Sequence, residues 1–194
     1  VSDTYTVVNH ATEQAVADVQ MADLAAVDAA IDRAAAALPA WRAITPGERA
    51  TLLRRFASVV DAHVEELAEL EVRNSGHTWG NAVWEAGNVR DVLNYYSASP
   101  ERLTGHQIPV GGGVDITFHE PLGVVGIIVP WNFPMPIAAW GFGPALAAGN
   151  TVVLKPSDTT PVSTVMLAEI AARHIPPGVL NVVCGDRVTG AAVV

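Results

Sequence analysis

The sequence contains little cysteine and little charge, and each shortage excludes a class of protein. Cys184 is the single cysteine of the 194 residues, so an internal disulfide is impossible and a reducing compartment such as the cytoplasm is expected. Charged residues make up only 16% of the chain and hydrophobic residues 50%, a balance that excludes an intrinsically disordered protein. The net charge of −9 includes no block of basic residues, so neither nucleic acid nor an anionic membrane is expected as a partner.

Long apolar segments are missing as well. The most apolar run, Leu122–Trp131, is about ten residues long and contains Pro130, whereas a membrane helix needs about 20 residues. The N-terminal residues VSDTYTVVNH lack the positive start and the apolar centre of a signal peptide. We therefore predict a cytoplasmic globular protein without a membrane segment.

The first part of the chain has the pattern of a strand pair followed by helices. Apolar residues flanking polar turns in the 5–19 segment predict a hairpin. Apolar positions then recur at helical spacing from Leu24 to Leu38, and Pro39 is expected to end that helix. A further helix is expected between Val83 and Tyr96, before Pro100.

One helix start carries a specific signal. Thr45 is suited to cap the helix, Pro46 fits its first turn, and Glu48 stands where a capping box needs an acidic residue. The apolar stripe that follows predicts a helix that has a break near His63 and stops around Gly76.

The pattern changes to strands after about residue 105. Three glycines, and then Val114, Ile116 and Phe118 alternating with polar residues, predict a hairpin in the 106–120 segment with one buried face.

From Val124 onward, strands and helices alternate. Three apolar runs predict strands, of which the first is expected to be buried on both faces and the second to be buried as well. Two helices are expected between the strands, the first interrupted near Gly143 and Pro144. The expected strands are Val124–Val129, Thr151–Leu154 and Val179–Val183, and the expected helices are Pro136–Ala148 and Thr160–Arg173. Strand, helix, strand, helix, strand at this spacing predicts an α/β fold with a parallel sheet.

The residues that follow each expected strand are polar or conformationally unusual. They read PWNFP from Pro130, KPSD from Lys155 and CGDR from Cys184. In open parallel sheets, ligands bind beyond the carboxyl ends of the strands, so these loops are the expected functional site.

The segment 120–161, EPLGVVGIIVPWNFPMPIAAWGFGPALAAGNTVVLKPSDTTP, resembles the aldehyde dehydrogenase superfamily almost position by position. PWNFP, GPALAAGN and VLKPS are motifs typical of that family, and the resemblance extends over essentially the whole chain. It implies the N-terminal part of an NAD(P)-dependent aldehyde dehydrogenase, with a Rossmann-like cofactor-binding sheet and helices on both of its faces. By resemblance, residues 1–105 and 121–194 belong to the cofactor-binding domain and residues 106–120 to an oligomerisation hairpin, with a homodimer or homotetramer expected.

The resemblance also implies a reaction. A cysteine thiolate attacks the aldehyde, and the acid forms through a thiohemiacetal and a thioester. In the family the side-chain amide of Asn132 and the backbone N–H of that cysteine stabilise the oxyanion. The nucleophile is expected beyond residue 194, so these residues alone are expected to be inactive. Cys184 could be activated by a following helix N-terminus, but its place in the sequence argues against a catalytic role.

The remaining implied residues bind the cofactor. In the family the lysine at Lys155 contacts the adenosine ribose, and a carboxylate at the Asp158 position accepts from the ribose hydroxyls. A carboxylate there repels a 2′-phosphate, which favours NAD over NADP, although many members carry the longer glutamate. The cofactor-binding residues implied by the resemblance are Ile128, Val129, Pro130, Trp131, Asn132, Lys155, Ser157, Asp158 and Gly185.

Each of these side chains also has a purely structural interpretation. Asn132 suits the cap of the helix that starts near Pro134, and Asp158 that of the helix after Thr160. Lys155 could be a strand-end lysine that extends its ammonium group to water. The six histidines do not pair at metal-ligand spacing, so the sequence suggests no metal site.

Two other functions remain open for the whole protein. One is a non-catalytic cofactor-binding or structural protein, and the other is a related reductase of acyl phosphates or acyl-CoA. The combination of PWNFP with KPSD favours aldehyde oxidation.

Overall fold

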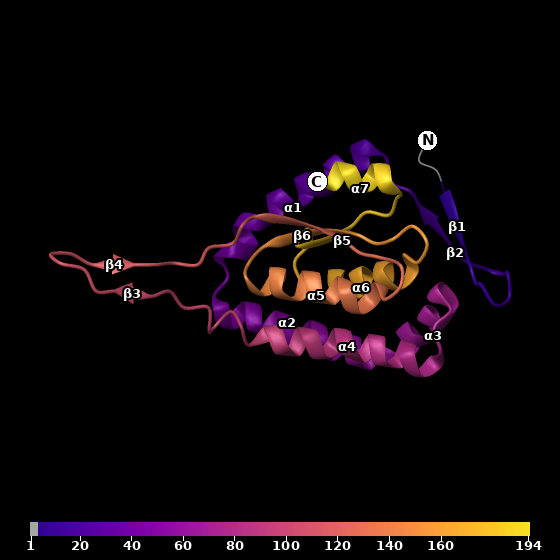
Figure 1. Cartoon of the computed structure of the whole chain (residues 1–194), viewed down its shortest axis with the longest axis horizontal. Coiled ribbons are helices and arrows are strands. Elements are labelled where there is room, and N and C mark those ends of the chain that lie inside the picture. The colour runs from indigo at the N-terminus through magenta and orange to yellow at the C-terminus, as the bar shows by residue number, and fades with distance from the viewer. Residues whose placement is uncertain (1–3) are drawn as a thin grey trace.

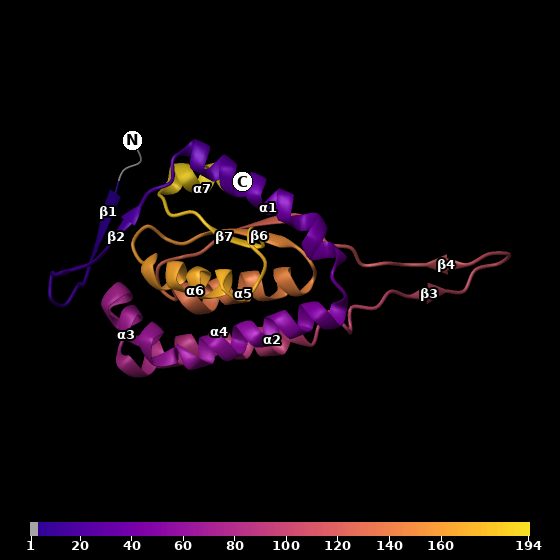
Figure 2. The same cartoon turned by 180° about the vertical axis from the view of Figure 1, so that it is seen from behind.

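The computed structural model describes residues 4–194, in which a small parallel sheet is covered by helices on both faces. The elements in chain order are β1 (Thr4–Val8), β2 (Ala15–Gln20), α1 (Leu24–Ala43), α2 (Pro46–Ala62), α3 (Val64–Ser75), α4 (Trp79–Ser97), β3 (Gln107–Ile108), β4 (Asp115–Ile116), β5 (Val124–Ile128), α5 (Pro134–Ala147), β6 (Thr151–Lys155), α6 (Val162–Ala172), β7 (Leu180–Val182) and α7 (Arg187–Val193). Helices α1 and α7 lie on one face of the sheet and α5 and α6 on the other, with α2 and α4 packed outside them (Figures 1 and 2). None of the helices in residues 4–194 is long and apolar enough to cross a membrane.

The predicted pair of βαβ units is confirmed. The sheet has the order β5-β6-β7, and all its strands are parallel. Ile128 pairs with Lys155 at the carboxyl end of β5 and β6, and Leu154 pairs with Val182 in β7. The loops after the three strands therefore emerge at one edge of the sheet.

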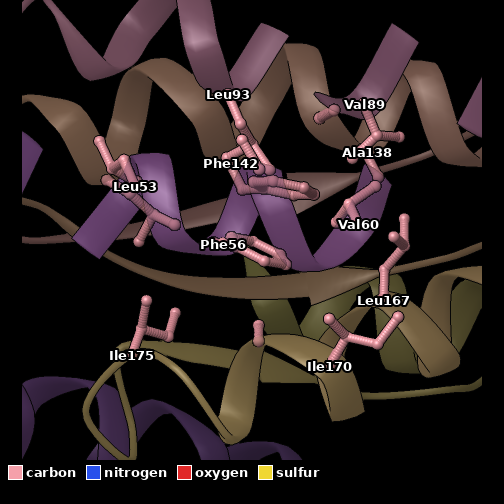
Figure 3. Packing of buried hydrophobic residues seen from close by; sticks show 14 of the residues in the cluster. Leu53, Phe56, Val60, Val89, Leu93, Ala138, Phe142, Leu167, Ile170 and Ile175 are labelled. Atoms are coloured by element: carbon pink, nitrogen blue, oxygen red, sulfur yellow. The ribbon is translucent and has the colours of Figure 1, made fainter. Parts of the chain in front are cut away.

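The core lies between the sheet, α5 and the outer helices. Phe56 of α2 and Phe142 of α5 stack with ring centroids 5.9 Å apart, and both are fully buried. Leucine and valine side chains of α2 and α4 close around them (Figure 3). Truncating a buried phenylalanine typically costs about 3–5 kcal/mol, so this contact fixes α5 and the loop before it.

Two predicted helix breaks are wrong. Pro39 is exposed, and α1 continues past it to Ala43 because the buried Trp41 anchors the last turn. Helix α5 likewise runs through Gly143 and Pro144 without interruption. A proline inside a helix costs about 3 kcal/mol. Here the buried side chains on both sides of Pro144, Phe142 and Leu146, offset that cost.

The predicted burial of two strand regions is also wrong. Only β6 is buried along its whole length, because it is the central strand, whereas β5 is a sheet edge within residues 4–194 and its Ile128 is 51% exposed. The β3–β4 hairpin forms as predicted but has no buried face. It projects from the body as an arm (Figure 1), and Val114 and Phe118 on it are 77% and 81% exposed.

Candidate functional site

Three loops that follow β5, β6 and β7 are tied together at the carboxyl edge of the sheet. The backbone N–H of Val129 donates to the Lys155 carbonyl over 3.0 Å, and the Thr160 hydroxyl donates to the Trp131 carbonyl over 2.9 Å. The structure thus brings the PWNFP loop and the KPSD loop side by side, as the sequence predicts for neighbouring parallel strands.

Lys155 connects the second and third loops. Its side chain is buried, and its Nζ donates to the carbonyl oxygens of Pro156 and Gly185, each over 2.6 Å. Burial lowers the pKa of Lys155, and the nearby carboxylate of Asp158 opposes that shift. An ammonium group has three donors, so one N–H remains for a ligand at this edge.

Asp158 does not cap the helix that follows it. The N-cap of α6 is Pro161, and α6 has no side-chain cap. Instead, Asn74 of α3 accepts from the Val162 backbone N–H over 3.3 Å. The half-buried Asp158 carboxylate accepts only a 3.3 Å hydrogen bond from Ser157 among the described residues, which leaves acceptor sites for a ligand.

Asn132 is exposed and does not cap α5. The N-cap residue is Phe133, and the helix start has no side-chain cap. The next residue, Phe133, packs its ring against His77 and Trp84, with centroids 5.1 and 6.1 Å away. The backbone around the Asn132 amide is therefore fixed while the amide itself is free of hydrogen bonds to residues 4–194.

The apolar residues predicted around the cleft divide into two groups. Ile128, Pro130 and Trp131 are exposed at the end of β5, with Trp131 at 63%. Val129 is 2% exposed and its side chain belongs to the core. For Val129, strand packing accounts for the side chain, and only its backbone stands at the strand end.

Gly185 follows β7 and permits a close approach of α7. A Cβ atom at this position would lie 1.9 Å from the Thr189 hydroxyl oxygen, so no other residue fits without moving the helix. Asp186 caps α7 by accepting from the backbone N–H groups of Val188 and Thr189. The glycine thus lets the first turn of α7 reach the end of β6, where Lys155 binds the Gly185 carbonyl.

Cys184 does not have the properties of a nucleophile. Its thiol is buried, and burial raises its pKa to about 11, although the neighbouring Lys155 acts in the opposite direction. The proximity of a helix N-terminus, which the sequence shows, does not compensate for that burial. Burial and the raised pKa both favour the protonated thiol at neutral pH, which argues against Cys184 as a nucleophile.

One cluster was missed by sequence reasoning. Glu71 of α3, His77 of the following turn and Glu85 of α4 each offer a ligand atom within 4.8 Å of the other two. Burial raises the pKa of both carboxyl groups, that of Glu85 to about 7, and Glu71 contributes to the shift of Glu85. Histidine spacing alone could not reveal this group, because two of its members are glutamates on different helices.

The comparisons with known proteins agree with the geometry. The sequence model of the Aldehyde dehydrogenase family matches residues 1–194. This chain belongs to the aldehyde dehydrogenase family. Fluoroacetaldehyde dehydrogenase of Streptantibioticus cattleyicolor is 44% identical to it over 163 residues, which are 82% of this chain and 32% of that relative.

Solved structures of the family match the same region. The NAD+ complex of an aldehyde dehydrogenase from Bacillus cereus has a TM-score of 0.95 at 36% identity, covering 98% of this chain and 40% of that one. An E. coli structure described as an NADP-dependent enzyme has a TM-score of 0.94 at 38% identity, with the same coverage of 98% and 40%. The chain therefore spans between 32% and 40% of the length of these relatives.

Proposed function

We propose that this family member takes part in the oxidation of an aldehyde to a carboxylic acid with NAD as the acceptor. Residues 1–105 and 121–194 would form the cofactor-binding part and residues 106–120 the oligomerisation arm of a homodimer or homotetramer. The supporting observation is the arrangement at the carboxyl edge of the sheet. There a buried lysine with a spare donor lies near the aspartate Asp158, and the neighbouring loop carries Asn132. Neither Asp158 nor Asn132 caps a helix.

The residues present fit an adenine dinucleotide. Lys155 and Asp158 provide one donor and one acceptor for ribose hydroxyls. Ser157 donates a hydrogen bond to the Asp158 carboxylate, and the Gly185 carbonyl accepts one from Lys155. The exposed faces of Ile128, Pro130 and Trp131 offer an apolar surface next to them. When bound there, NAD supplies the hydride acceptor of the reaction.

Beyond cofactor binding, the proposal gives Asn132 the role of a hydrogen-bond donor to the reacting oxygen. Its free side-chain N–H groups can donate to the oxyanion that forms when a nucleophile attacks the aldehyde carbonyl. The only cysteine of the 194 residues is the buried Cys184, so the attacking thiolate does not come from them. The residues of this chain therefore bind and orient the cofactor, and the Asn132 amide provides one hydrogen-bond donor for the oxyanion.

Cofactor choice tests the proposal. The Asp158 carboxylate disfavours a 2′-phosphate, so Asp158→Ser should lower the dissociation constant of NADP relative to that of NAD by a few-fold to tenfold, about 1 kcal/mol. Isothermal titration of the purified protein with each nucleotide measures the ratio. Asp115→Ser on the exposed β4 strand is the matched control and should leave the ratio unchanged.

Two outcomes would contradict parts of this picture. If the folded protein binds neither nucleotide at millimolar concentration, the proposed function is wrong. If it binds both but Asp158→Ser leaves their ratio unaltered, Asp158 takes no part in cofactor selection.

A further inference from the structure

The cluster of Glu71, His77 and Glu85 lies outside the cofactor edge and joins separate elements. Glu71 is in α3, Glu85 is in α4, and His77 is in the short turn that connects these helices. Both glutamates are fully buried, whereas the His77 side chain is 20% exposed. Figure 1 shows α3 and the beginning of α4 at the end of the molecule next to the β1–β2 hairpin.

The buried carboxylates are incompletely satisfied by the protein. His77 Nδ1 contacts Glu85 Oε1, and Asn74 Nδ2 donates to Glu71 Oε2 over 3.3 Å. In residues 4–194, the second oxygen of each carboxylate, Glu71 Oε1 and Glu85 Oε2, is buried without a hydrogen-bond partner. Leaving a buried acceptor unpaired costs about 1–3 kcal/mol of folding free energy, and more for a charged group. A ligand that binds these two oxygens would remove that cost.

No lysine or arginine fills that role among the described residues. Within residues 4–194, the contact between Glu85 and His77 is the only ion pair that involves Glu71 or Glu85. One imidazole carries at most one positive charge. When both carboxyl groups are ionised, their two negative charges are therefore not fully compensated in this medium of low dielectric constant. A cation of higher charge would neutralise both.

We propose that Glu71, His77 and Glu85 form a binding site for a divalent transition-metal ion. One imidazole nitrogen and two carboxylate oxygens make up a donor set typical of Zn²⁺, which binds such ligands at about 2.0–2.2 Å. Two ligands of one ion then lie at most about 4.4 Å apart, so ligand atoms that lie within 4.8 Å of one another need only a small inward shift. The nitrogen ligand disfavours Mg²⁺ and Ca²⁺, which prefer oxygen.

Neighbouring residues already hold the ligands in place. Asn74 Nδ2 also donates to the Thr160 carbonyl and to the Ser163 hydroxyl, each over 3.2 Å, so the Glu71 carboxylate is connected to the start of α6. The His77 ring packs on Phe133, the residue after Asn132. A bound ion would therefore clamp α3 to α4 and stiffen the support of the Asn132 loop. This inference does not depend on the proposed function.

Titration of the full chain with metal tests the site directly. The protein is treated with EDTA, dialysed, and titrated calorimetrically with ZnCl₂ at pH 7.5. We expect one ion per chain with a dissociation constant of micromolar or below, together with visible absorption bands when CoCl₂ replaces ZnCl₂. MgCl₂ at the same concentration should give no binding heat.

Variants assign the binding to the cluster. His77→Ala and the isosteric Glu85→Gln should each weaken Zn²⁺ binding at least tenfold. His174→Ala, which removes another partly buried histidine outside the cluster, should not change it. Circular dichroism and thermal melting establish that each variant is folded, and Glu85→Gln decides the matter if His77→Ala does not fold.

Two results would overturn the proposal. One is the absence of Zn²⁺ binding by the folded wild-type chain at 100 µM ZnCl₂, a concentration well above the expected dissociation constant. The other is unchanged affinity in folded Glu85→Gln, which would place the ion on other histidines and leave the cluster as a buried trio that shares protons.

Discussion

Asn132 owes its freedom to the residues that follow it. Helix α5 begins Pro134-Met135-Pro136, and proline has no backbone N–H, so the first turn offers few donors for a cap to satisfy. The Ile137 N–H already donates to the Phe133 carbonyl over 3.2 Å. A side chain at Asn132 therefore adds little to helix stability, and its amide is available for a ligand.

Kinetics of two Asn132 variants distinguish an oxyanion donor from a cap. If the proposed aldehyde oxidation is correct, Asn132→Ala in the active enzyme should lower kcat/KM by about 10²–10³ while NAD affinity stays near wild type. Asn132→Asp should be at least as damaging, because it places a negative charge beside a developing oxyanion.

The cap interpretation predicts the opposite order, since aspartate caps a helix about as well as asparagine and alanine does not. Steady-state kinetics and thermal melting are measured on both variants. If Asn132→Asp keeps near-normal activity and only Asn132→Ala melts early, the oxyanion role is wrong.

Individual residues also show which features of the site can be predicted from the sequence. The sequence locates Lys155 and Asn132 at strand ends, because apolar runs followed by polar residues mark such ends. It does not reveal that Lys155 binds the Gly185 carbonyl, a contact 30 positions away that depends on how α7 packs. The same limit hides the Glu71–His77–Glu85 cluster, which exists only once α3 and α4 fold against each other.

At the level of helices and strands, sequence motifs predict correctly those features that depend on neighbouring residues. The predicted capping box is present, with Glu48 N–H donating to the Thr45 hydroxyl over 3.2 Å and Thr45 N–H donating to the Glu48 carboxylate over 2.9 Å. The breaks expected at Pro39 and Pro144 fail, because the packing of buried neighbours outweighs the local cost of a proline. Propensity thus predicts helix starts better than it predicts breaks inside buried helices.

The capping box gives a stability prediction for α2. Thr45→Ala removes the hydroxyl that accepts from Glu48 N–H, and it should lower the free energy of unfolding by about 1 kcal/mol. The capped geometry also lowers the pKa of Glu48 through its hydrogen bonds to Thr45, so the two residues act together. Urea denaturation followed by circular dichroism measures the change.

Thr104→Ala is the matched control, because Thr104 is exposed and lies outside every helix and strand. It should alter the free energy of unfolding by less than about 0.5 kcal/mol. Equal effects of the two substitutions would mean that the Thr45 cap does not contribute.

The whole molecule follows the alternation of strands and helices in the sequence, which predicts the parallel sheet. The placement of helices on both faces of the sheet was predicted from the family resemblance. The pattern could not show which apolar surfaces are covered. Alternation in the 114–118 segment indicates that one face is meant for burial, yet the arm projects from the body and neither face is covered by residues 4–194 (Figure 2). The alternation of apolar and polar residues shows that one face of a strand is apolar. Whether that face is buried depends on the element that packs against it.

The exposed arm therefore predicts association between copies. Val114 and Phe118 are 77% and 81% exposed, and burying an apolar side chain of this size contributes about 1.5–3 kcal/mol. If the arm joins protomers, the double variant Val114→Ser, Phe118→Ser should weaken self-association at least tenfold and shift the protein toward the monomer. Sedimentation velocity over a range of concentrations measures the distribution, and circular dichroism verifies the fold. Leu24→Ser removes an exposed apolar side chain on α1 and should leave the distribution unchanged. An unaltered oligomer in the double variant, or an equal shift in Leu24→Ser, would show that the arm does not hold the copies together.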